Sequence, residues 1–256
     1  MRGRQSAKGF TLVEVITVVV ILAIVSVIGT TFIVSSTESY MQTRSRAKLV
    51  NTARPAIERM TRQLRGALPH SVRVTNGGQC VQFLPVAGAG TYLNAVPDQS
   101  NNAPNHSSIA TSAHDQEFGD AAFLSIGAMG SDELYGGGGV SLAEVTGRTA
   151  TSVSFASRRW ERNSLSRRFY LLDQPQAFCL FNNQLRFYPD QDITASAVDT
   201  GSTYQLLARN ADASGTPFAL SAGSENRSIN VLISLGFIEG GERVEFNQEV
   251  LIRNVP

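Results

Sequence analysis

One carboxylate stands directly before the most apolar stretch of the sequence. Residues 15–34 contain no charged side chain, and Glu14 precedes them. A helix of this length rises about 30 Å, the thickness of a bilayer hydrocarbon core. A charged side chain within such a span costs about 2.5–3.5 kcal/mol, so we expect Glu14 to have a partner or a function. The alternative is that Glu14, one turn from the helix end, extends to the membrane interface.

A basic segment before the span sets its expected orientation. Arg2, Arg4 and Lys8 are positively charged, and no acidic residue lies among residues 1–9. The positive-inside rule therefore keeps the N-terminus in the cytoplasm and sends the rest of the chain across the membrane. A secretory signal is cut after its apolar region at a small-x-small site. Residues 35–45 match that pattern poorly, whereas Gly9 is a small residue placed before the span.

The sequence KGFTLVE, residues 8–14, closely resembles the processing site of type IV prepilins. The resemblance implies that prepilin peptidase cleaves between Gly9 and Phe10 and that Phe10 becomes an N-methylated terminus. It also implies that Glu14, the fifth mature residue, pairs with the terminal amine of a neighbouring subunit during assembly. Residues 1–9 would then be the leader peptide and residues 10–37 the transmembrane and assembly helix. The implied partners are the peptidase, other major and minor pilins, and the bacterial inner membrane.

A second, amphipathic helical segment is predicted over residues 38–69. Apolar residues recur there at three- and four-residue steps, which gives a stripe that a sheet can cover. The stripe consists of Ala53, Ile57, Met60, Leu64 and Leu68. Pro55 is expected to kink or break the helix, because proline removes a hydrogen-bond donor and clashes with the preceding turn. Residues 44–65 hold seven basic side chains against the single acid Glu58. They form either a solvated face or a surface that pairs with acidic neighbours in a filament.

Residues 70–256 are predicted to form a β-rich periplasmic domain. Together with the helix they give an α+β, pilin-like fold, in which a long N-terminal helix packs on an antiparallel sheet. Residues 168–189 predict three strands with turns at 173–175 and 182–183, and two more strands flank Gly240 and Gly241. Val244, Phe246, Val250 and Ile252 are expected to share one face of the last strand. Residues 86–120 and 127–141 are rich in small and polar residues and predict long loops, with a turn at 88–90.

The two cysteines predict one disulfide. Cys80 and Cys179 lie far apart in the sequence and outside any Cys-x-x-Cys spacing. An even, minimal count on an exported chain favours a structural bond between them, with two buried free thiols as the alternative.

No motif for catalysis or a cofactor is present, so we expect neither an enzyme nor a bound cofactor. The net charge of +1 gives no support for nucleic acid as the main partner. Two weak metal-site candidates are His114 with Asp115 and Glu117, and a calcium loop at Asp190 and Asp192; neither has enough ligands nearby, and we expect no metal site. The arginine-rich segment around Trp160 is expected to be a solvated turn, with the tryptophan covering the edge of the core.

Two further stretches resemble particular subgroups of the pilin family. Residues 56–74 and 80–86 resemble minor pilins of the MSHA type, and the helix ending also resembles PilW-type minor pilins and J-type minor pseudopilins. The resemblance implies a low-copy subunit that helps to start or cap a pilus. A minor pseudopilin of type II secretion is one alternative. A membrane-anchored periplasmic module that binds a ligand through its long loops is another.

Overall fold

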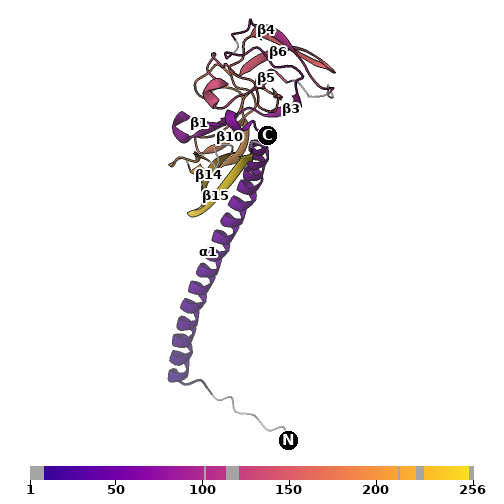
Figure 1. Cartoon of the computed structure of the whole chain (residues 1–256). Coiled ribbons are helices and arrows are strands. Elements are labelled where there is room, and N and C mark those ends of the chain that lie inside the picture. The colour runs from indigo at the N-terminus through magenta and orange to yellow at the C-terminus, as the bar shows by residue number, and fades with distance from the viewer. Residues whose placement is uncertain (1–8, 101, 114–120, 213, 223–227, 254–256) are drawn as a thin grey trace.

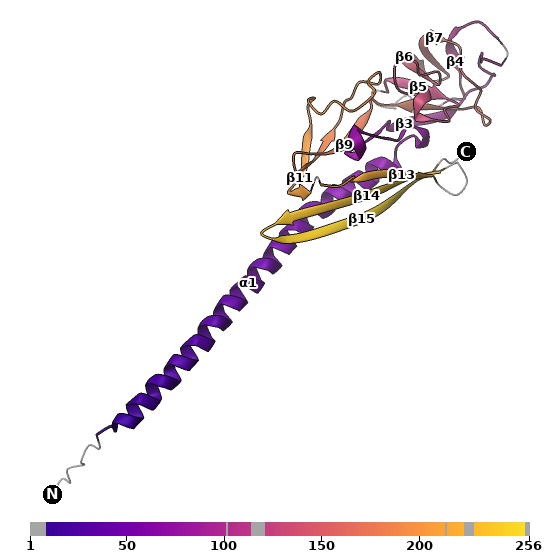
Figure 2. The ribbon, with the colours of Figure 1, turned by 90° about the vertical axis from the view of Figure 1, so that its left-hand side faces the viewer.

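The fold is built on a single helix. The computed structural model describes residues 9–100, 102–113, 121–212, 214–222 and 228–253. Helix α1 (Leu12–Arg65) projects far beyond the globular part, and only its C-terminal half contacts the strands (Figures 1 and 2). It runs without interruption from the apolar segment into the amphipathic one, as expected of a continuing helix, and the N–H of Gly66 caps its end by donating to the carbonyl groups of Gln63 and Leu64.

The predicted apolar stripe is confirmed. Leu68 is buried but lies beyond the end of α1 and packs in a different cluster. The other four residues, Ala53, Ile57, Met60 and Leu64, are buried within α1 together with Leu49 and Ala56. Their spacing places these helical residues on one side of α1, since positions three and four apart share a face. That side forms the central core together with aromatic and aliphatic residues of two sheets.

Of the two effects expected of Pro55, a kink or a break, the break does not occur. Pro55 lies inside α1, on its exposed side. The hydrogen bond that proline cannot donate would have gone to the carbonyl of Asn51, which is also an exposed residue, so water can satisfy that carbonyl. Ala53, Ala56 and Ile57, on either side of Pro55, are buried against the sheets, and this packing holds the helix together through the proline.

Two antiparallel sheets cover the C-terminal half of α1. The first sheet, in order along the sheet, contains β1 (Arg73–Thr75), β2 (Cys80–Phe83), β9 (Gln176–Phe181), β10 (Gln184–Tyr188) and β11 (Gln205–Arg209). In the second, β14 (Ser228–Glu239) pairs with β15 (Glu242–Arg253) on one side and with β12 (Ala211–Asp212) and β13 (Phe218–Ala222) on the other. Short 3-10 helices occupy Pro69–Ser71, Asn76–Gly78 and Ser131–Glu133.

Two hairpins form where the turn residues predict them. Asn182 and Asn183 have φ values of 50° and 56° between β9 and β10. Gly240 and Gly241 have φ values of 60° and 82° between β14 and β15. Both pairs adopt the positive φ that a two-residue hairpin needs, which glycine and asparagine tolerate. Val244, Phe246, Val250 and Ile252 share the inward face of β15, also as predicted.

The chain between β2 and β9 forms a separate six-stranded sheet. Its order is β3 (Val86–Thr91), β8 (Arg168–Leu172), β5 (Phe123–Ile126), β6 (Leu142–Thr149), β7 (Ser152–Arg158) and β4 (His106–Ala110). The edge strands meet at one end, where Tyr92 bridges Thr111 and the N–H of Leu93 donates to the carbonyl of Ala110 at 2.9 Å. This inserted subdomain, residues 86–172, lies at the end of the molecule away from the free half of α1 (Figures 1 and 2).

The prediction of loops over residues 86–120 is therefore wrong in part. Residues 88–90 belong to β3 rather than to a turn. A Cβ atom at Gly90 would lie 2.7 Å from the ring of Phe169, so glycine is needed there because the strand packs closely under an aromatic ring. Small residues in this stretch reflect close packing, which composition alone does not separate from loop character. Residues 127–141 contain no strand, as predicted.

Trp160 is a core residue rather than a cover at the core edge. Its side chain is 0 % exposed and packs edge-on against Phe155, with ring centroids 5.3 Å apart. Arg158 lies over the Trp160 ring at 5.0 Å, and the backbone of Trp160 pairs with residues 97–99. Trp160 and Phe155 belong to the core of the six-stranded sheet, and Arg158 packs on it. The segment is therefore not a free solvated turn.

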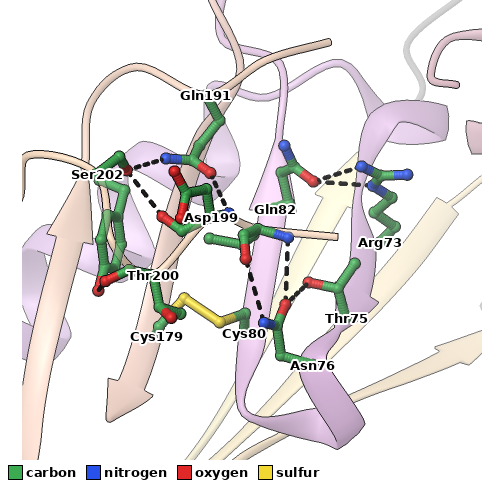
Figure 3. Close-up of a disulfide and its surroundings, with 12 residues drawn as sticks. Arg73, Thr75, Asn76, Cys80, Gln82, Cys179, Gln191, Asp199, Thr200 and Ser202 are labelled. Atoms are coloured by element: carbon green, nitrogen blue, oxygen red, sulfur yellow. Dashed lines mark hydrogen bonds between the residues drawn. A yellow bond between two sulfur atoms is a disulfide. The ribbon is translucent and has the colours of Figure 1, made fainter. Parts of the chain in front are cut away.

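A disulfide closes the base of the inserted subdomain. Cys80 of β2 and Cys179 of β9 lie opposite one another in the ladder, and their Sγ atoms are bonded across 99 residues of chain. Both side chains are buried on the face of the sheet that points away from α1. Figure 3 shows the polar contacts that hold residues 190–202 beside the bond. Gln191 accepts from the N–H of Asp199 at 2.7 Å, and the Asn76 amide group bonds both backbone groups of Val198 at 3.2 Å.

Replacing both cysteines by serine should weaken the fold. Because the bond closes a loop of 99 residues, the chain-entropy argument gives a loss of about 2–5 kcal/mol in the free energy of unfolding. The measurement is urea unfolding of the full chain in detergent, followed by the fluorescence of Trp160, the single tryptophan. Reduced wild-type protein is the matched control and should unfold at a similarly low urea concentration. Equal midpoints for the oxidised wild type and the variant would contradict this role.

Candidate functional site at the helix N-terminus

The proposed cleavage bond lies in an accessible position. Gly9 and Phe10 precede the helix, the Phe10 side chain is 78 % exposed, and no atom lies within 4 Å of the place a Gly9 Cβ would occupy. A peptidase needs an open, non-helical segment to reach a peptide bond, and these two residues provide one. Lys8 and the remainder of the leader lie outside the described residues.

Thr11 caps the helix, and Glu14 occupies the third helical position. The Thr11 hydroxyl accepts from the N–H of Glu14 at 3.3 Å, and the carbonyl of Thr11 accepts from Glu14 and Val15. The sequence Thr-x-x-Glu is the pattern of a capping box. The positive end of the helix dipole also stabilises a negatively charged glutamate at this position. The sequence analysis missed this role for Thr11, although residues 11–14 carry its signal.

The N-terminal half of α1 exposes its apolar side chains, and several of its hydroxyl groups bond to the helix backbone. It is the one described helix that is long and apolar enough to cross a membrane, and none of its most apolar window is buried by the rest of the chain. The hydroxyls of Ser26, Thr30 and Thr37 donate to the carbonyl four residues earlier, at 2.7–2.8 Å. Such internal bonds remove the need for water, so this surface suits either lipid or the apolar faces of other helices.

The comparisons with known proteins agree with this geometry. The model of the prokaryotic N-terminal methylation motif matches residues 4–30. Neither the curated proteins nor the solved structures yield a match. The motif and the long, exposed apolar helix mark the chain as a type IV pilin-like or pseudopilin-like protein, for which processing by prepilin peptidase and assembly with other pilins are implied.

Of the two weak metal candidates, the pair Asp190 and Asp192 is the one that lies within the described residues. Asp192 binds its own loop, accepting from the N–H and the hydroxyl of Thr194 at 2.8 Å. Asp190 and Asp192 line a cleft of about 510 Å³ together with Glu144. Within the described part of the chain, no group of three His, Cys, Asp or Glu residues is arranged to hold a metal ion. His114, Asp115 and Glu117 lie outside the described residues.

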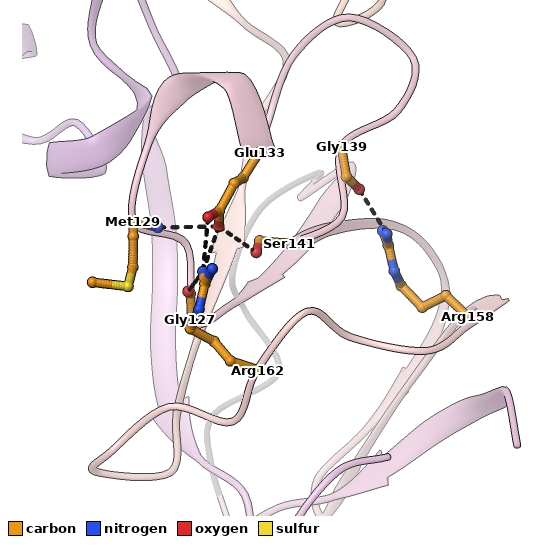
Figure 4. A network of polar contacts seen from close by, with 7 residues as sticks. All are labelled: Gly127, Met129, Glu133, Gly139, Ser141, Arg158 and Arg162. Atoms are coloured by element: carbon orange, nitrogen blue, oxygen red, sulfur yellow. Dashed lines mark hydrogen bonds and ion pairs between the residues drawn. The ribbon is translucent and has the colours of Figure 1, made fainter. Parts of the chain in front are cut away.

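A charged network in the inserted subdomain also escaped the sequence analysis. Arg162 donates to both carboxylate oxygens of Glu133 at 2.8 and 2.7 Å and to the carbonyl of Gly127 at 2.9 Å. Glu133 also accepts from the Ser141 hydroxyl at 2.8 Å and from the N–H of Met129 at 3.2 Å (Figure 4). The network fixes the loop of residues 127–141. Its members are up to 35 positions apart, and no sequence pattern pairs them.

The same network lowers the pKa of Glu133. Burial alone would raise the pKa, but the hydrogen bonds from Arg162, Ser141 and Met129 outweigh it, so the pKa lies below the ordinary value of 4.5. A depressed carboxyl pKa stabilises the fold fully above that ordinary value, and the contribution is lost as the pH falls through the folded-state pKa.

Glu133→Gln should therefore destabilise the inserted subdomain in a pH-dependent manner. At pH 7 we expect a loss of about 1–3 kcal/mol, the value of hydrogen bonds to a charged group. The difference from wild type should shrink as the pH falls below 4.5. Urea unfolding, monitored through the fluorescence of Trp160 at pH 7 and below pH 4.5, measures the loss of stability and its change with pH. Glu144→Gln is a control at an exposed carboxylate of β6 and should change little. A penalty for Glu133→Gln that stays constant with pH would contradict the ionic origin.

Proposed function

We propose that this protein is a structural subunit of a type IV pilus-like filament. In the proposal, prepilin peptidase hydrolyses the bond between Gly9 and Phe10, and the new Phe10 amine is methylated. Before assembly, residues 10–37 span the inner membrane and the C-terminal domain lies in the periplasm. It then leaves the bilayer as α1 packs beside the helices of other subunits. The observation that carries the proposal is the methylation motif placed on an exposed apolar helix.

Removal of the leader changes the electrostatics of the helix end. The loss of Arg2, Arg4 and Lys8 lowers the number of basic side chains from 22 to 19, against 21 acidic ones. It also creates an amine at Phe10, one residue before the Thr11 cap. The mature helix end thus offers one positive group and, one turn later, the negative Glu14.

Glu14 supplies the partner for the amine of a neighbouring subunit. Among apolar helices a lone carboxylate or a lone ammonium is strongly penalised, whereas a hydrogen-bonded pair compensates for much of that cost. A pair formed between two chains would therefore set the register of one helix against the next. The capping role of Thr11 keeps the backbone around Glu14 helical while its carboxylate is engaged elsewhere.

The finer proposal is a minor pilin of the MSHA type, similar to the pilus biogenesis protein MshO. Residues 56–74 and 80–86, which carry that resemblance, form the end of α1, β1 and β2. The inserted subdomain adds a large mass at the end away from the membrane span, which suits a low-copy subunit that starts or caps a filament. A minor pseudopilin would use the same helix and the same processing. The proposed role is structural because the motif is that of filament subunits.

Glu14→Ala tests the assembly role in the native host. Breaking a buried ion pair by removing one partner costs about 3–5 kcal/mol, so incorporation into filaments should fall by more than about tenfold. Processing and membrane insertion should be retained. The measurement compares this chain in sheared filaments with the chain left in the membrane, by quantitative immunoblot.

Thr11→Ala is the matched control. It removes the helix cap, at a cost of about 1 kcal/mol, but leaves the carboxylate in place. Incorporation of this variant should stay within about fivefold of wild type. If Glu14→Ala is incorporated normally, or if Thr11→Ala fails as badly, the carboxylate has no pairing role in assembly.

A further inference from the structure

Four arginines line the side of α1 that faces away from the sheets. We call them the arginine stripe: Arg44, Arg54, Arg62 and Arg65, all exposed. Arg44 and Arg62 are five turns apart at 3.6 residues per turn, so they point in about the same direction, and the other two lie within about a quarter turn of it. The buried residues Leu49, Ala53, Met60 and Leu64 occupy the opposite side. Glu58, the single acid between positions 44 and 65, lies on the same side, four residues from both Arg54 and Arg62.

The stripe contrasts with the arginines of the globular part. Arg59 donates to Gln205 and lies over Phe187, Arg73 donates to Gln82, and Arg162 and Arg243 form ion pairs. Lys48, at the edge of the stripe, pairs with Glu239. In the part of the chain that the structure describes, none of the four stripe arginines forms an ion pair. Their charge is therefore available to a partner.

The membrane is not that partner for most of the stripe. Arg54 lies 20 residues beyond Val34, and that stretch of helix rises about 30 Å. The headgroup region extends only about 5–8 Å beyond the hydrocarbon core on each side. Arg54, Arg62 and Arg65 therefore stand well clear of lipid when residues 15–34 span the bilayer.

A neighbouring helix is the occupant that the geometry favours. The apolar half of α1 is exposed all round and needs covering once it leaves lipid. Because α1 is one continuous rod, a helix laid along its apolar half continues beside its C-terminal half. The sheets cover the opposite side there, so the stripe side is where a second helix can lie.

A second copy of this chain would fit badly in that position. Parallel stacking would set against each other two faces that each carry four arginines and one acid, Glu58, and this excess of positive charge on both sides repels. We propose that the arginine stripe docks the acidic helix face of a different pilin-like subunit, so that this chain pairs with another subunit and not with itself. This inference rests on the proposed function and names the chemistry of the partner.

A charge-reversed copy of the chain can serve as the probe. The variant Arg54→Glu/Arg62→Glu/Arg65→Glu presents an acidic face in place of the stripe and leaves every buried residue unchanged. A two-hybrid assay in the bacterial inner membrane, with reporter fragments fused before residue 1 of the full chain, keeps the helices parallel. The association of wild type with the reversed variant should exceed that of wild type with itself by about fivefold, from three exposed ion pairs.

Two controls make the outcome decisive. Arg54→Gln/Arg62→Gln/Arg65→Gln removes the charge, so wild type should prefer the reversed variant over this neutral one. Two reversed copies should associate as weakly as two wild-type copies. Equal signals for all combinations, or strongest pairing of wild type with itself, would overturn the proposal. Binding of purified full-length chain to a DNA duplex, lost in the glutamine variant, would also overturn it by assigning the stripe to nucleic acid.

The assay uses a host without prepilin peptidase, since cleavage after Gly9 would release the reporter, and it does not depend on Glu14. If Glu14→Ala assembles normally but reversed copies still pair with wild type, the stripe stands as a helix-docking surface while the filament role falls. If Glu14→Ala fails to assemble and all combinations in the two-hybrid assay give equal signals, the filament role stands and the stripe proposal is wrong.

Discussion

The structure depends on one helix whose two halves have different surroundings. Between Leu49 and Leu64, α1 buries a single stripe against two sheets, and this packing organises the central core. Between Leu12 and Val34 the same helix is apolar on every side and receives no cover from its own chain. Folding therefore completes only half of the helix. The other half is long and apolar enough to cross a membrane, and the proposed role as a filament subunit would cover it first with lipid and then with other helices.

The inserted subdomain is attached without disturbing that helix. It leaves the first sheet after β2 and returns at β9, the two strands joined by Cys80 and Cys179. The disulfide faces away from α1, so the central core and the base of the insertion use opposite sides of the same strands. A second core around Trp160 and Phe169 and the network at Glu133 stabilise the insertion from within.

The sequence predicted best the features that depend on local patterns. The stripe on α1 followed from its spacing, and the hairpins at Asn182–Asn183 and Gly240–Gly241 followed from turn chemistry. The prediction at Pro55 failed because tertiary packing on the buried side outweighed one missing hydrogen bond on the exposed side. The strand at residues 86–91 was missed because Gly90 packs under Phe169, a residue 79 positions away. The pairing of Glu133 with Arg162 likewise depends on distant segments, which one sequence cannot bring together.

The central claim is that the working protein begins at Phe10 and keeps its apolar helix. The most direct test is the intact mass of the protein purified from its native host, combined with sequencing of its N-terminus. The expected chain starts at Phe10 and carries one additional methyl group on its terminal amine. A chain that retains Met1, or one cut beyond Val34, would contradict it.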